Sequence, residues 1–324
     1  MLQKPAFFFL WLCLFPSFFS AQSLGSFFSV AEEDAAFVDD SGNPSCRKMP
    51  DSHGHSGTPL RVTEYKGPSF DSLVPVKTRT YREGKPEAEQ VFGADGAVVS
   101  ALQYVYNDAG LLAEIRGADA AGVLKWAYRF VYDEQSRLEQ EISVSVADGQ
   151  ESVESSILSF YDSSSRLVKR ETFSAEGAVT LRETFIYNEN GKLAEKNSYY
   201  GDETLLKRTV YEYAVPEEET ARASSAPSGA VYRIRHYDSN GLYETVALEY
   251  QDGRVSSVFR YGADGVLKDR ETRVYAEGKP LRMLTVNADG NVASGSFCLY
   301  DWMGNPVLER DSAGITVWEF AYPG

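Results

Sequence analysis

Turn-forming residues recur about every dozen positions over most of the chain, and this period limits the fold more than any other feature. Gly241, Gly253, Gly265, Gly278 and Gly290 follow one another at intervals of 12 or 13 residues. Asp or Asn at the start of such a turn accepts hydrogen bonds from its own backbone, and Gly adopts a positive φ without strain. About eight to ten residues remain between turns, which is the usual length of a strand. The period therefore predicts one strand after another.

A longer cycle of two strands and two turns is marked by tyrosines that precede turns. They are Tyr81, Tyr106, Tyr132, Tyr161, Tyr187, Tyr213, Tyr237, Tyr250, Tyr275 and Tyr300. Most intervals are 24 to 26 residues, and the 13 residues from Tyr237 to Tyr250 are read as half a cycle. Because each half of the cycle contains one strand and one turn, we expect about 19 strands in residues 81–324. No helical period competes with this pattern, so we expect an all-β domain of antiparallel hairpins over residues 61–324.

The faces of the predicted strands differ in character. In residues 123–132 one face carries Trp126, Tyr128 and Phe130, which is typical of a half-buried antiparallel strand. Charges occur on both faces elsewhere, as in residues 166–173. A lipid-facing row does not tolerate frequent charge, because Lys or Arg at mid-bilayer costs about 2–4 kcal/mol. This charge pattern disfavours an outer-membrane barrel.

The tyrosine motif is similar to that of a known repeat family. Residues 132–138 and 161–167 share Tyr-Asp-x-x-x-Arg-Leu, and close variants begin at Tyr106, Tyr187, Tyr237 and Tyr300. Over residues 81–324 this resembles the YD repeat of Rhs-type proteins, with a weaker likeness to MORN-variant repeats. The resemblance implies a repetitive antiparallel β-hairpin array that forms a long curved sheet. It also implies an exported or surface-associated binding role.

The N-terminal residues 1–23 have the features of a secretory signal peptide. Lys4 supplies the positive charge, residues 6–19 the apolar region, and residues 21–23 a small-x-small cleavage site. An uncleaved anchor is the less favoured alternative, because the apolar run is short and contains Pro16. Lipid attachment at Cys13 is not expected, because the large residues Trp11 and Leu12 precede it. No transmembrane segment is expected after cleavage.

Residues 24–60 show no sustained period and are predicted to be a flexible leader. Cleavage of the signal would leave Cys46 and Cys298, and two alternatives stay open for them. They form a disulfide that ties the leader to the last repeats, or they are two thiols with Cys298 in the core. A metal clip made by Cys46, His53 and His55 is disfavoured, because a metal site needs further ligands and a rigid frame. We therefore predict no metal site.

A polar segment interrupts the repeats at residues 214–230. It contains three consecutive Glu, two Pro and several Ala and Ser residues, which is typical of a solvated loop or linker. Because Tyr213 and Tyr237 are 24 residues apart, the segment is expected to replace about one unit of strands without breaking the count. We favour a protruding loop.

Catalytic residues and cofactor-binding residues are not predicted. The acidic residues are explained by turns and solvated faces, and His236 is expected to be structural. The net charge of −15 argues against nucleic acid as a partner. Exposed aromatic side chains could instead stack on sugars or grip a peptide, although a core face is the favoured interpretation. The candidates are Trp126, Tyr128, Phe130, Tyr199 and Tyr200.

The sequence as a whole predicts an exported bacterial repeat protein with a structural or binding role in the periplasm or at the cell surface. It is predicted to be non-enzymatic and to need no cofactor. Its expected partners are a protein or a cell-surface carbohydrate. Two alternatives remain: an outer-membrane-associated β-barrel, and a carbohydrate-active enzyme built on a curved sheet.

Overall fold

The computed structural model describes residues 59–214, 226–276, 278–300 and 304–321, and they form a single sheet of twenty antiparallel strands. One short 3-10 helix, η1 (Phe70–Ser72), lies in these ranges. The strands are β1 (Arg61–Gly67), β2 (Val74–Arg82), β3 (Lys85–Phe92), β4 (Val98–Tyr106), β5 (Leu112–Asp119), β6 (Leu124–Tyr132), β7 (Leu138–Ala147), β8 (Gln150–Tyr161), β9 (Leu167–Ser174), β10 (Val179–Tyr187), β11 (Leu193–Tyr200), β12 (Leu205–Tyr213), β13 (Val231–Asp238), β14 (Gly241–Gln251), β15 (Arg254–Gly262), β16 (Leu267–Ala276), β17 (Lys279–Asn287), β18 (Val292–Tyr300), β19 (Pro306–Asp311) and β20 (Gly314–Ala321).

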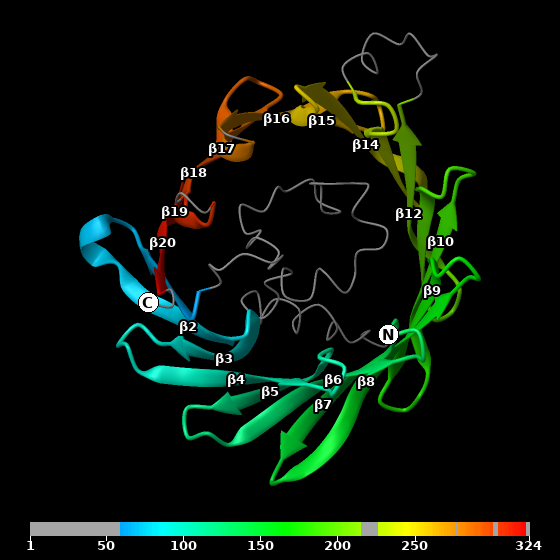
Figure 1. Cartoon of the computed structure of the whole chain (residues 1–324). Coiled ribbons are helices and arrows are strands. Elements are labelled where there is room, and N and C mark those ends of the chain that lie inside the picture. The colour runs from blue at the N-terminus through cyan, green and yellow to red at the C-terminus, as the bar shows by residue number, and fades with distance from the viewer. Residues whose placement is uncertain (1–58, 215–225, 277, 301–303, 322–324) are drawn as a thin grey trace, which may run out of the picture.

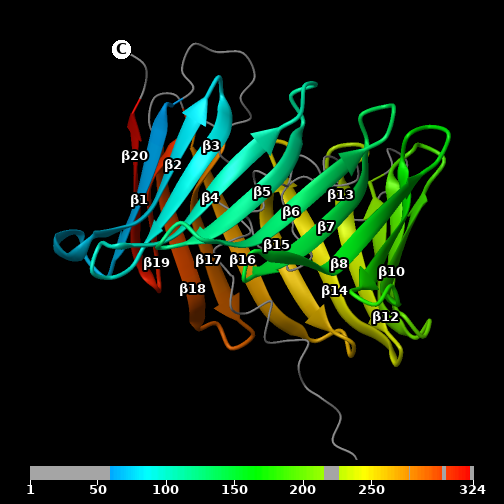
Figure 2. The same ribbon diagram turned by 90° about the horizontal axis from the view of Figure 1, so that it is seen from below.

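The sheet closes on itself into a barrel. Each strand pairs with its neighbours in the chain, and β1 also pairs with β20 in antiparallel register from Arg61↔Ala321 to Gly67↔Ile315. The backbone N–H of Leu60 adds a hydrogen bond of 2.7 Å to the carbonyl of Ala321. Every strand therefore has two partners, and the ring of strands is continuous (Figure 1). Figure 2 shows the same wall from the side.

The predicted long curved sheet is therefore wrong in its topology, although the all-β class and the antiparallel hairpins are correct. Pairing between β1 and β20 overturns it. The charges on both strand faces were the argument against an outer-membrane barrel. Such charges indicate whether water or lipid surrounds the outer face of the sheet. They do not bear on closure, which depends on whether the first and last strands satisfy each other's backbone groups. From β3 to β20 the chain forms eighteen strands, close to the predicted count beyond residue 81.

The turns after the even-numbered strands lie at one end of the barrel, which we call the YD rim, and those after β4, β6, β8 and β10 share one conformation. In the turn after β6, Asp133 Oδ1 accepts hydrogen bonds of 2.9 Å from the backbone N–H groups of Gln135 and Arg137. Ser136 has a φ of 62°, the conformation that Gly110 adopts (φ 75°) in the equivalent turn after β4. The pairing shifts register at the tyrosine that precedes the turn. Asp at the first turn position and a positive φ at the fourth thus produce the hairpin.

Replacing Ser136 with Gly is expected to stabilise the barrel. A non-Gly residue at positive φ costs about 1–2 kcal/mol, and Gly loses part of that gain through its freer unfolded chain. The net increase in unfolding free energy should be about 0.5–1 kcal/mol, measured from the urea midpoint. Ser164→Gly is the matched control, because Ser164 is an exposed turn serine that is not among the positive-φ residues. A stabilisation of equal size in both variants would contradict this account.

The segment at residues 214–230 is an insertion in a hairpin and does not replace any strands. The flanking strands β12 and β13 pair directly, with Tyr211 opposite Ile234. Tyr237 was therefore misread as a cycle marker, since it ends an odd-numbered strand at the opposite rim. Residues 215–225 lie outside the described residues, so the protruding loop stays a prediction.

Two groups of buried side chains pack along the wall. One lies on β4 to β7 and contains Leu102, Tyr104, Leu112, Ile115, Phe130 and Leu138. The other lies on β13 to β15 and contains Val231, Ile234, Val246, Leu248, Val255 and Val258. Both clusters consist of side chains from neighbouring strands of one curved wall, since all the strands of the described residues belong to a single sheet.

Candidate functional site: the lumen face and its tyrosine rim

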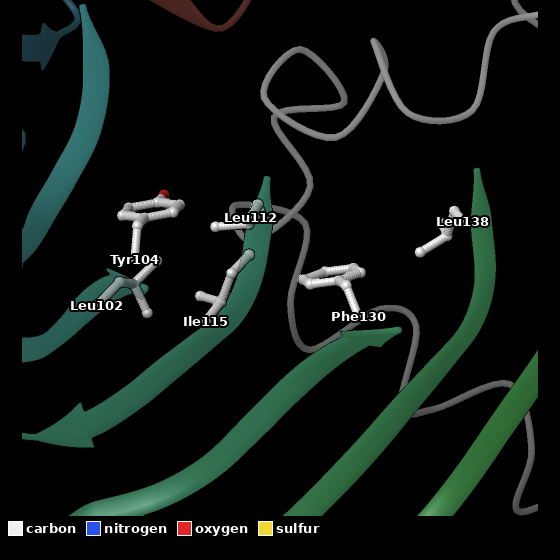
Figure 3. Close-up of a cluster of buried hydrophobic side chains, with 6 residues drawn as sticks. All are labelled: Leu102, Tyr104, Leu112, Ile115, Phe130 and Leu138. Carbon is white, nitrogen blue, oxygen red and sulfur yellow. The ribbon is translucent and has the colours of Figure 1, made fainter. Parts of the chain in front are cut away.

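Alternate side chains of each strand point into the barrel, and we call this surface the lumen face. Figure 3 shows Leu102, Tyr104, Ile115 and Phe130 projecting from the ribbons of β4, β5 and β6 toward the inside of the barrel. Residues that lie opposite each other on paired strands are on the same side of the sheet. The strand pairing therefore identifies the inward-facing residues of every strand. The remaining side chains form the outer face.

The tyrosines that end the even-numbered strands form a hydrogen-bonded ladder at the YD rim. Each hydroxyl donates to the carbonyl of a residue at the start of the preceding odd-numbered strand. The pairs are Tyr106–Pro86 (2.8 Å), Tyr132–Leu112 (2.8 Å), Tyr161–Leu138 (2.8 Å), Tyr187–Leu167 (2.8 Å), Tyr213–Leu193 (2.7 Å), Tyr250–Val231 (2.5 Å), Tyr275–Val255 (2.8 Å) and Tyr300–Pro280 (2.8 Å). The ladder therefore ties each strand to its neighbour beside the bulge where backbone pairing is interrupted.

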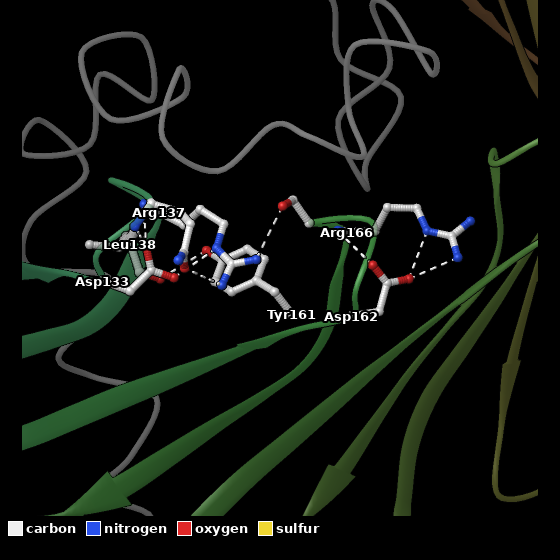
Figure 4. Close-up of polar contacts among 8 residues, drawn as sticks. Asp133, Arg137, Leu138, Tyr161, Asp162 and Arg166 are labelled. Atoms are coloured by element: carbon white, nitrogen blue, oxygen red, sulfur yellow. Dashed lines mark hydrogen bonds and ion pairs between the residues drawn. The ribbon is translucent and has the colours of Figure 1, made fainter.

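The remaining residues of the Tyr-Asp-x-x-x-Arg-Leu motif connect one repeat to the next (Figure 4). Arg137 Nε donates to Asp133 Oδ2 at 2.7 Å, and the guanidinium lies 4.7 Å from the centre of the Tyr161 ring. The same Tyr161 donates its hydroxyl hydrogen bond to the carbonyl of Leu138. Arg166 repeats the arrangement over Tyr187 at 4.8 Å. Each fixed residue of the motif thus has its own role: Asp holds the turn, Arg pairs with Asp and lies over the next Tyr, and the Leu carbonyl accepts the hydrogen bond of that Tyr.

Burial keeps the ladder hydroxyls protonated. Burial is the largest cause that raises the pKa of Tyr132 to about 12, with a smaller contribution from Glu141. Burial also raises the pKa of Tyr106 and of Tyr250 to about 12. At neutral pH these hydroxyls therefore remain hydrogen-bond donors.

Replacing Tyr161 with Phe tests how much one hydrogen bond of the tyrosine ladder contributes to stability. The change removes the hydroxyl and leaves the ring beneath Arg137, so the expected loss of unfolding free energy is about 1 kcal/mol. The carbonyl of Leu138 loses a partner at the same time. Tyr200→Phe is the control, because Tyr200 also ends a strand and is 49% exposed. Urea denaturation of both variants should show a loss for Tyr161→Phe and almost none for Tyr200→Phe.

Ion pairs link neighbouring strands on the lumen face. On β1 to β3, Lys77 Nζ lies 3.9 Å from a carboxylate oxygen of both Glu64 and Glu89. Arg79 pairs with Glu89 at 2.6 Å, and the side chain of Glu89 is only 3% exposed. Two positive and two negative side chains thus compensate one another across three strands.

A second chain of ion pairs crosses β7 and β9 to β11. Arg170 lies between Glu141 (2.9 Å) and Glu183 (3.6 Å), and Lys196 pairs with Glu183 at 3.2 Å. Burial raises the pKa of Glu141, while the positive charge of Arg170 opposes that shift. The alternation of charge along the chain of pairs keeps this part of the lumen wall close to neutral.

A third network on β15 and β16 is the most buried. Arg273 Nε lies 2.6 Å from Glu271 Oε1, and these side chains are 1% and 5% exposed. Arg260 pairs with Asp269 at 2.7 Å and approaches Glu271 at 3.7 Å. The lumen face therefore combines aromatic patches with compensated charge.

The five predicted binding aromatics do not form one surface. Trp126, Tyr128 and Phe130 share the lumen face of β6, where the rings of Trp126 and Tyr128 meet edge to face at 5.5 Å. Tyr199 and Tyr200 lie on β11, five strands away, and point to opposite faces as consecutive strand residues. Only the β6 group contributes to an aromatic patch of the lumen.

The predicted structural role of His236 agrees with its surroundings. The ring is buried on β13, with Nδ1 3.1 Å from Thr209 Oγ1 and the ring stacked on Tyr243 at 6.0 Å. Cys298 is fully buried on the lumen face of β18, in register with Glu309 of β19. Cys46, His53 and His55 lie outside the described residues, so both the disulfide and the disfavoured metal clip stay untested expectations. The same is true of the signal peptide and of Cys13.

The ion-pair networks and the tyrosine ladder were missed by the sequence analysis. The fixed spacing of Arg five residues after Tyr was a usable signal for the ladder. The networks depend on which residues of neighbouring strands lie opposite each other, and the spacing of residues along the chain does not contain this information. Among the described residues no group of three or more His, Cys, Asp and Glu side chains is arranged to hold a metal ion. In the same residues no helix has the length and apolar character needed to cross a membrane.

Comparison with known proteins gives distant structural likeness. No family model matches the chain, and no curated protein matches it. A porin-like protein from Bacteroides uniformis is similar over 82% of this chain and 98% of its own, with 8% identity and a TM-score of 0.34. A TcdB2-TccC3-TEV chain is similar over 76% of this chain and 16% of its own, with 13% identity and a TM-score of 0.24. At such scores the barrel assignment rests on the strand pairing of this chain itself.

Proposed function

We propose that this protein is an exported, non-enzymatic barrel of the cell envelope with a structural or binding role, surrounded by water in the periplasm or at the cell surface. The observation that carries the proposal is the row of ion pairs on the outer face. Export is supported by the signal-peptide pattern of residues 1–23.

The outer-face ion pairs lie at mid-strand as well as at the rims. Glu114 of β5 pairs with Arg116 at 2.7 Å and with Arg129 of β6 at 3.0 Å. Both arginine side chains keep more than a third of their surface exposed. Arg182 of β10 pairs with Glu171 of β9 at 2.9 Å on the same face. Because a charged side chain facing lipid costs about 2–4 kcal/mol at the midplane, such rows favour water around the wall.

An outer-membrane barrel is the second candidate, and closure of the sheet favours it. A bilayer leaves no partner for an unpaired backbone group, so only helices and closed barrels span it. Here β1 and β20 complete the ring, so that each of the twenty described strands is paired on both sides. Most strands have eight to ten residues, near the length of about 9–11 residues that a tilted strand needs to cross a membrane.

Fractionation of an expressing bacterium separates the two candidates. The first predicts that the full chain, expressed with its own signal, is recovered without detergent in the exported soluble fraction or by washing the cell surface. It also predicts the same gel migration before and after boiling. Recovery only in detergent extracts of membranes washed with alkaline carbonate, with heat-modifiable migration, would establish the second candidate.

The non-enzymatic part of the proposal is supported by the state of the lumen carboxylates. Glu89, Glu141, Glu183 and Glu271 each lie within ion-pair distance of Arg or Lys. A general acid needs a free approach to its substrate, and a carboxylate that is held by a neighbouring Arg or Lys does not offer it. Hydrolysis of any member of a glycan panel by the purified chain, abolished by neutralising one carboxylate, would contradict it.

We also propose that the likeness to YD repeats of Rhs-type proteins reflects shared repeat mechanics. The support is that Tyr161, Asp133, Arg137 and Leu138 act together across a repeat boundary in this barrel. The motif residues thus stabilise the contact between neighbouring repeats at the YD rim. We therefore expect the partner to bind at the lumen face or at the opposite rim. A protein or a cell-surface carbohydrate remains the proposed partner class.

A further inference from the structure

The outer face of β15 to β19 carries positive charge without negative charge beside it. None of the outward-facing residues that the strand pairing identifies on these five described strands is Asp or Glu. Arg270, Arg282 and Arg310 face outward and are exposed, and among the described residues none of the three has a carboxylate within ion-pair distance. Elsewhere on the outer face arginines pair with carboxylates, as Arg116 does with Glu114. In a chain with a net charge of −15, this part of the wall is a local excess of positive charge.

Exposed apolar side chains lie in the same row as two of these arginines. Val274, Arg282, Phe297 and Arg310 are successive register partners across β16, β17, β18 and β19, which lie side by side in the ring (Figure 1). Val274 is 48% exposed and Phe297 is 38% exposed. Leu299, two residues from Phe297 on the same face of β18, is 42% exposed. We call these five residues the apolar–basic patch.

The composition of the apolar–basic patch indicates what it can contact. Single exposed apolar residues are ordinary on a protein surface, but a contiguous group of them marks a contact surface. Elsewhere on the outer face, Ala127 and Val144 are 0% and 1% exposed. Arg282 and Arg310 flank Phe297 on either side, so their backbones are two strand spacings or about 10 Å apart. A partner must therefore offer negative charge on both sides of a position that accepts an aromatic ring.

The curvature of the wall favours a flat partner. The patch lies on the outside of a closed barrel, so its side chains project from a convex surface toward the partner. A small ligand or a peptide side chain is usually held in a concave site. A bilayer surface instead accepts projecting apolar side chains at any point, and its phosphate groups lie beside them. Arginine suits this surface, because its guanidinium binds phosphate oxygens and its stem packs against apolar groups.

We propose that the apolar–basic patch docks the barrel sideways on a bilayer surface that carries anionic phosphate headgroups. Phe297 and Leu299 enter the headgroup layer, and the guanidinium groups of Arg282 and Arg310 bind phosphate oxygens. The net negative charge of the whole chain opposes contact through other parts of the wall, so the patch also sets the orientation. The contact is separate from the partner-binding surface proposed above. It rests on the proposal that water surrounds the barrel.

Sedimentation with vesicles tests the two arginines. The full mature chain, purified without detergent, is mixed with phosphatidylcholine vesicles that contain about 30% phosphatidylglycerol, or with pure phosphatidylcholine vesicles. It should sediment with the anionic vesicles alone and be released by about 0.5 M NaCl. Arg282→Gln/Arg310→Gln should lower the apparent affinity by roughly tenfold or more. Arg116→Gln/Arg208→Gln is the matched control, because it removes the same charge from outer-face side chains that are both 47% exposed and paired with carboxylates.

A second pair of variants tests the apolar side chains. Phe297→Ala/Leu299→Ala should also lower the apparent affinity by roughly tenfold or more, because it removes the side chains that enter the headgroup layer. The control is Val131→Ala/Ile186→Ala, which shortens two outward-facing side chains that are 41% and 50% exposed. Circular dichroism and urea denaturation show that each variant keeps its fold. Equal losses of affinity in the patch variants and their controls would overturn the proposal.

The remaining outcomes separate this proposal from the proposed function. A chain that is soluble without detergent but does not bind anionic vesicles would overturn the docking and leave the water-surrounded barrel in place. Protein that stays with the vesicles after a wash with alkaline carbonate would show insertion into the bilayer and overturn both. Binding of soluble polyglutamate, or self-association, that is lost in Arg282→Gln/Arg310→Gln and occurs without vesicle binding would also overturn the docking. It would assign the patch to an acidic protein or to a second copy of the chain.

Discussion

Replacing Glu271 with Gln is expected to lower the unfolding free energy by about 3–5 kcal/mol, the cost of removing one partner from a buried ion pair. The change removes a carboxylate that lies 2.6 Å from Arg273 Nε, where both side chains are at most 5% exposed. The guanidinium stays charged, so its desolvation is no longer offset by that partner. Urea denaturation followed by circular dichroism measures the loss.

Two further variants make this prediction specific. Arg273→Met should cost less than Glu271→Gln, because Glu271 then still lies 3.7 Å from Arg260. Glu203→Gln should cost less than about 1 kcal/mol, because Glu203 pairs with Arg182 at the surface and is 75% exposed. Equal losses of unfolding free energy for Glu271→Gln and Glu203→Gln would contradict this account. They would show that the ion pairs of the lumen face are as accessible to water as those at the surface.

Replacing Gly117 with Ala is expected to lower the unfolding free energy by about 1–3 kcal/mol, because it overpacks a filled position. Gly117 of β5 is opposite Trp126 of β6, and a Cβ added to Gly117 would fall within the indole ring. Trp126 would have to leave its place beside Tyr128. A shift in tryptophan fluorescence should accompany the loss of stability.

A double-mutant cycle and a control glycine test the cause. In a Trp126→Ala background, Gly117→Ala should cost less than about 0.5 kcal/mol, because the clashing ring is gone. Gly295→Ala is the control, since Gly295 is also a strand glycine and its added Cβ would meet the flexible end of Leu284 at 3.3 Å. Similar losses at Gly117 and Gly295 would assign the effect to backbone entropy and not to Trp126.

The strands and turns were predictable because they depend on local chemistry. The Asp at position 133 and the glycine at position 110 fix their hairpins within a few residues, so a period read along the chain was enough. The alternation of Trp126, Tyr128 and Phe130 gave the correct face for the same reason. The reading of Tyr237 failed because an insertion in the β12–β13 turn shifts the spacing without changing the strand order.

Closure and the lumen networks could not be predicted in this way. The pairing of Arg61 with Ala321 joins residues from opposite ends of the barrel-forming segment, and no periodic signal reports it. Arg170 meets Glu141 across 29 positions in sequence, through the registers of two successive hairpins. Such pairs depend on accumulated bulges, each of which shifts the register by one residue.

Closure of the barrel is the central claim, and a cross-strand disulfide tests it most directly. Arg61→Cys and Ala321→Cys are combined in a Cys46→Ser/Cys298→Ser background, because residues 61 and 321 are register partners on β1 and β20. Opposite residues of antiparallel strands have Cβ atoms about 4.5–5.5 Å apart, close to the separation that a disulfide needs. The matched control is Arg61→Cys with Val317→Cys, four residues out of register or about 13 Å away.

After mild oxidation at low protein concentration, we predict that the 61/321 pair forms an intramolecular disulfide in nearly every chain. It should appear as a monomer of faster migration without reductant, while the 61/317 control keeps both thiols. A sheet with free β1 and β20 edges would instead give no bond at 61/321, or bonds between chains that appear as dimers and increase with concentration. Either of those results would contradict the closed barrel.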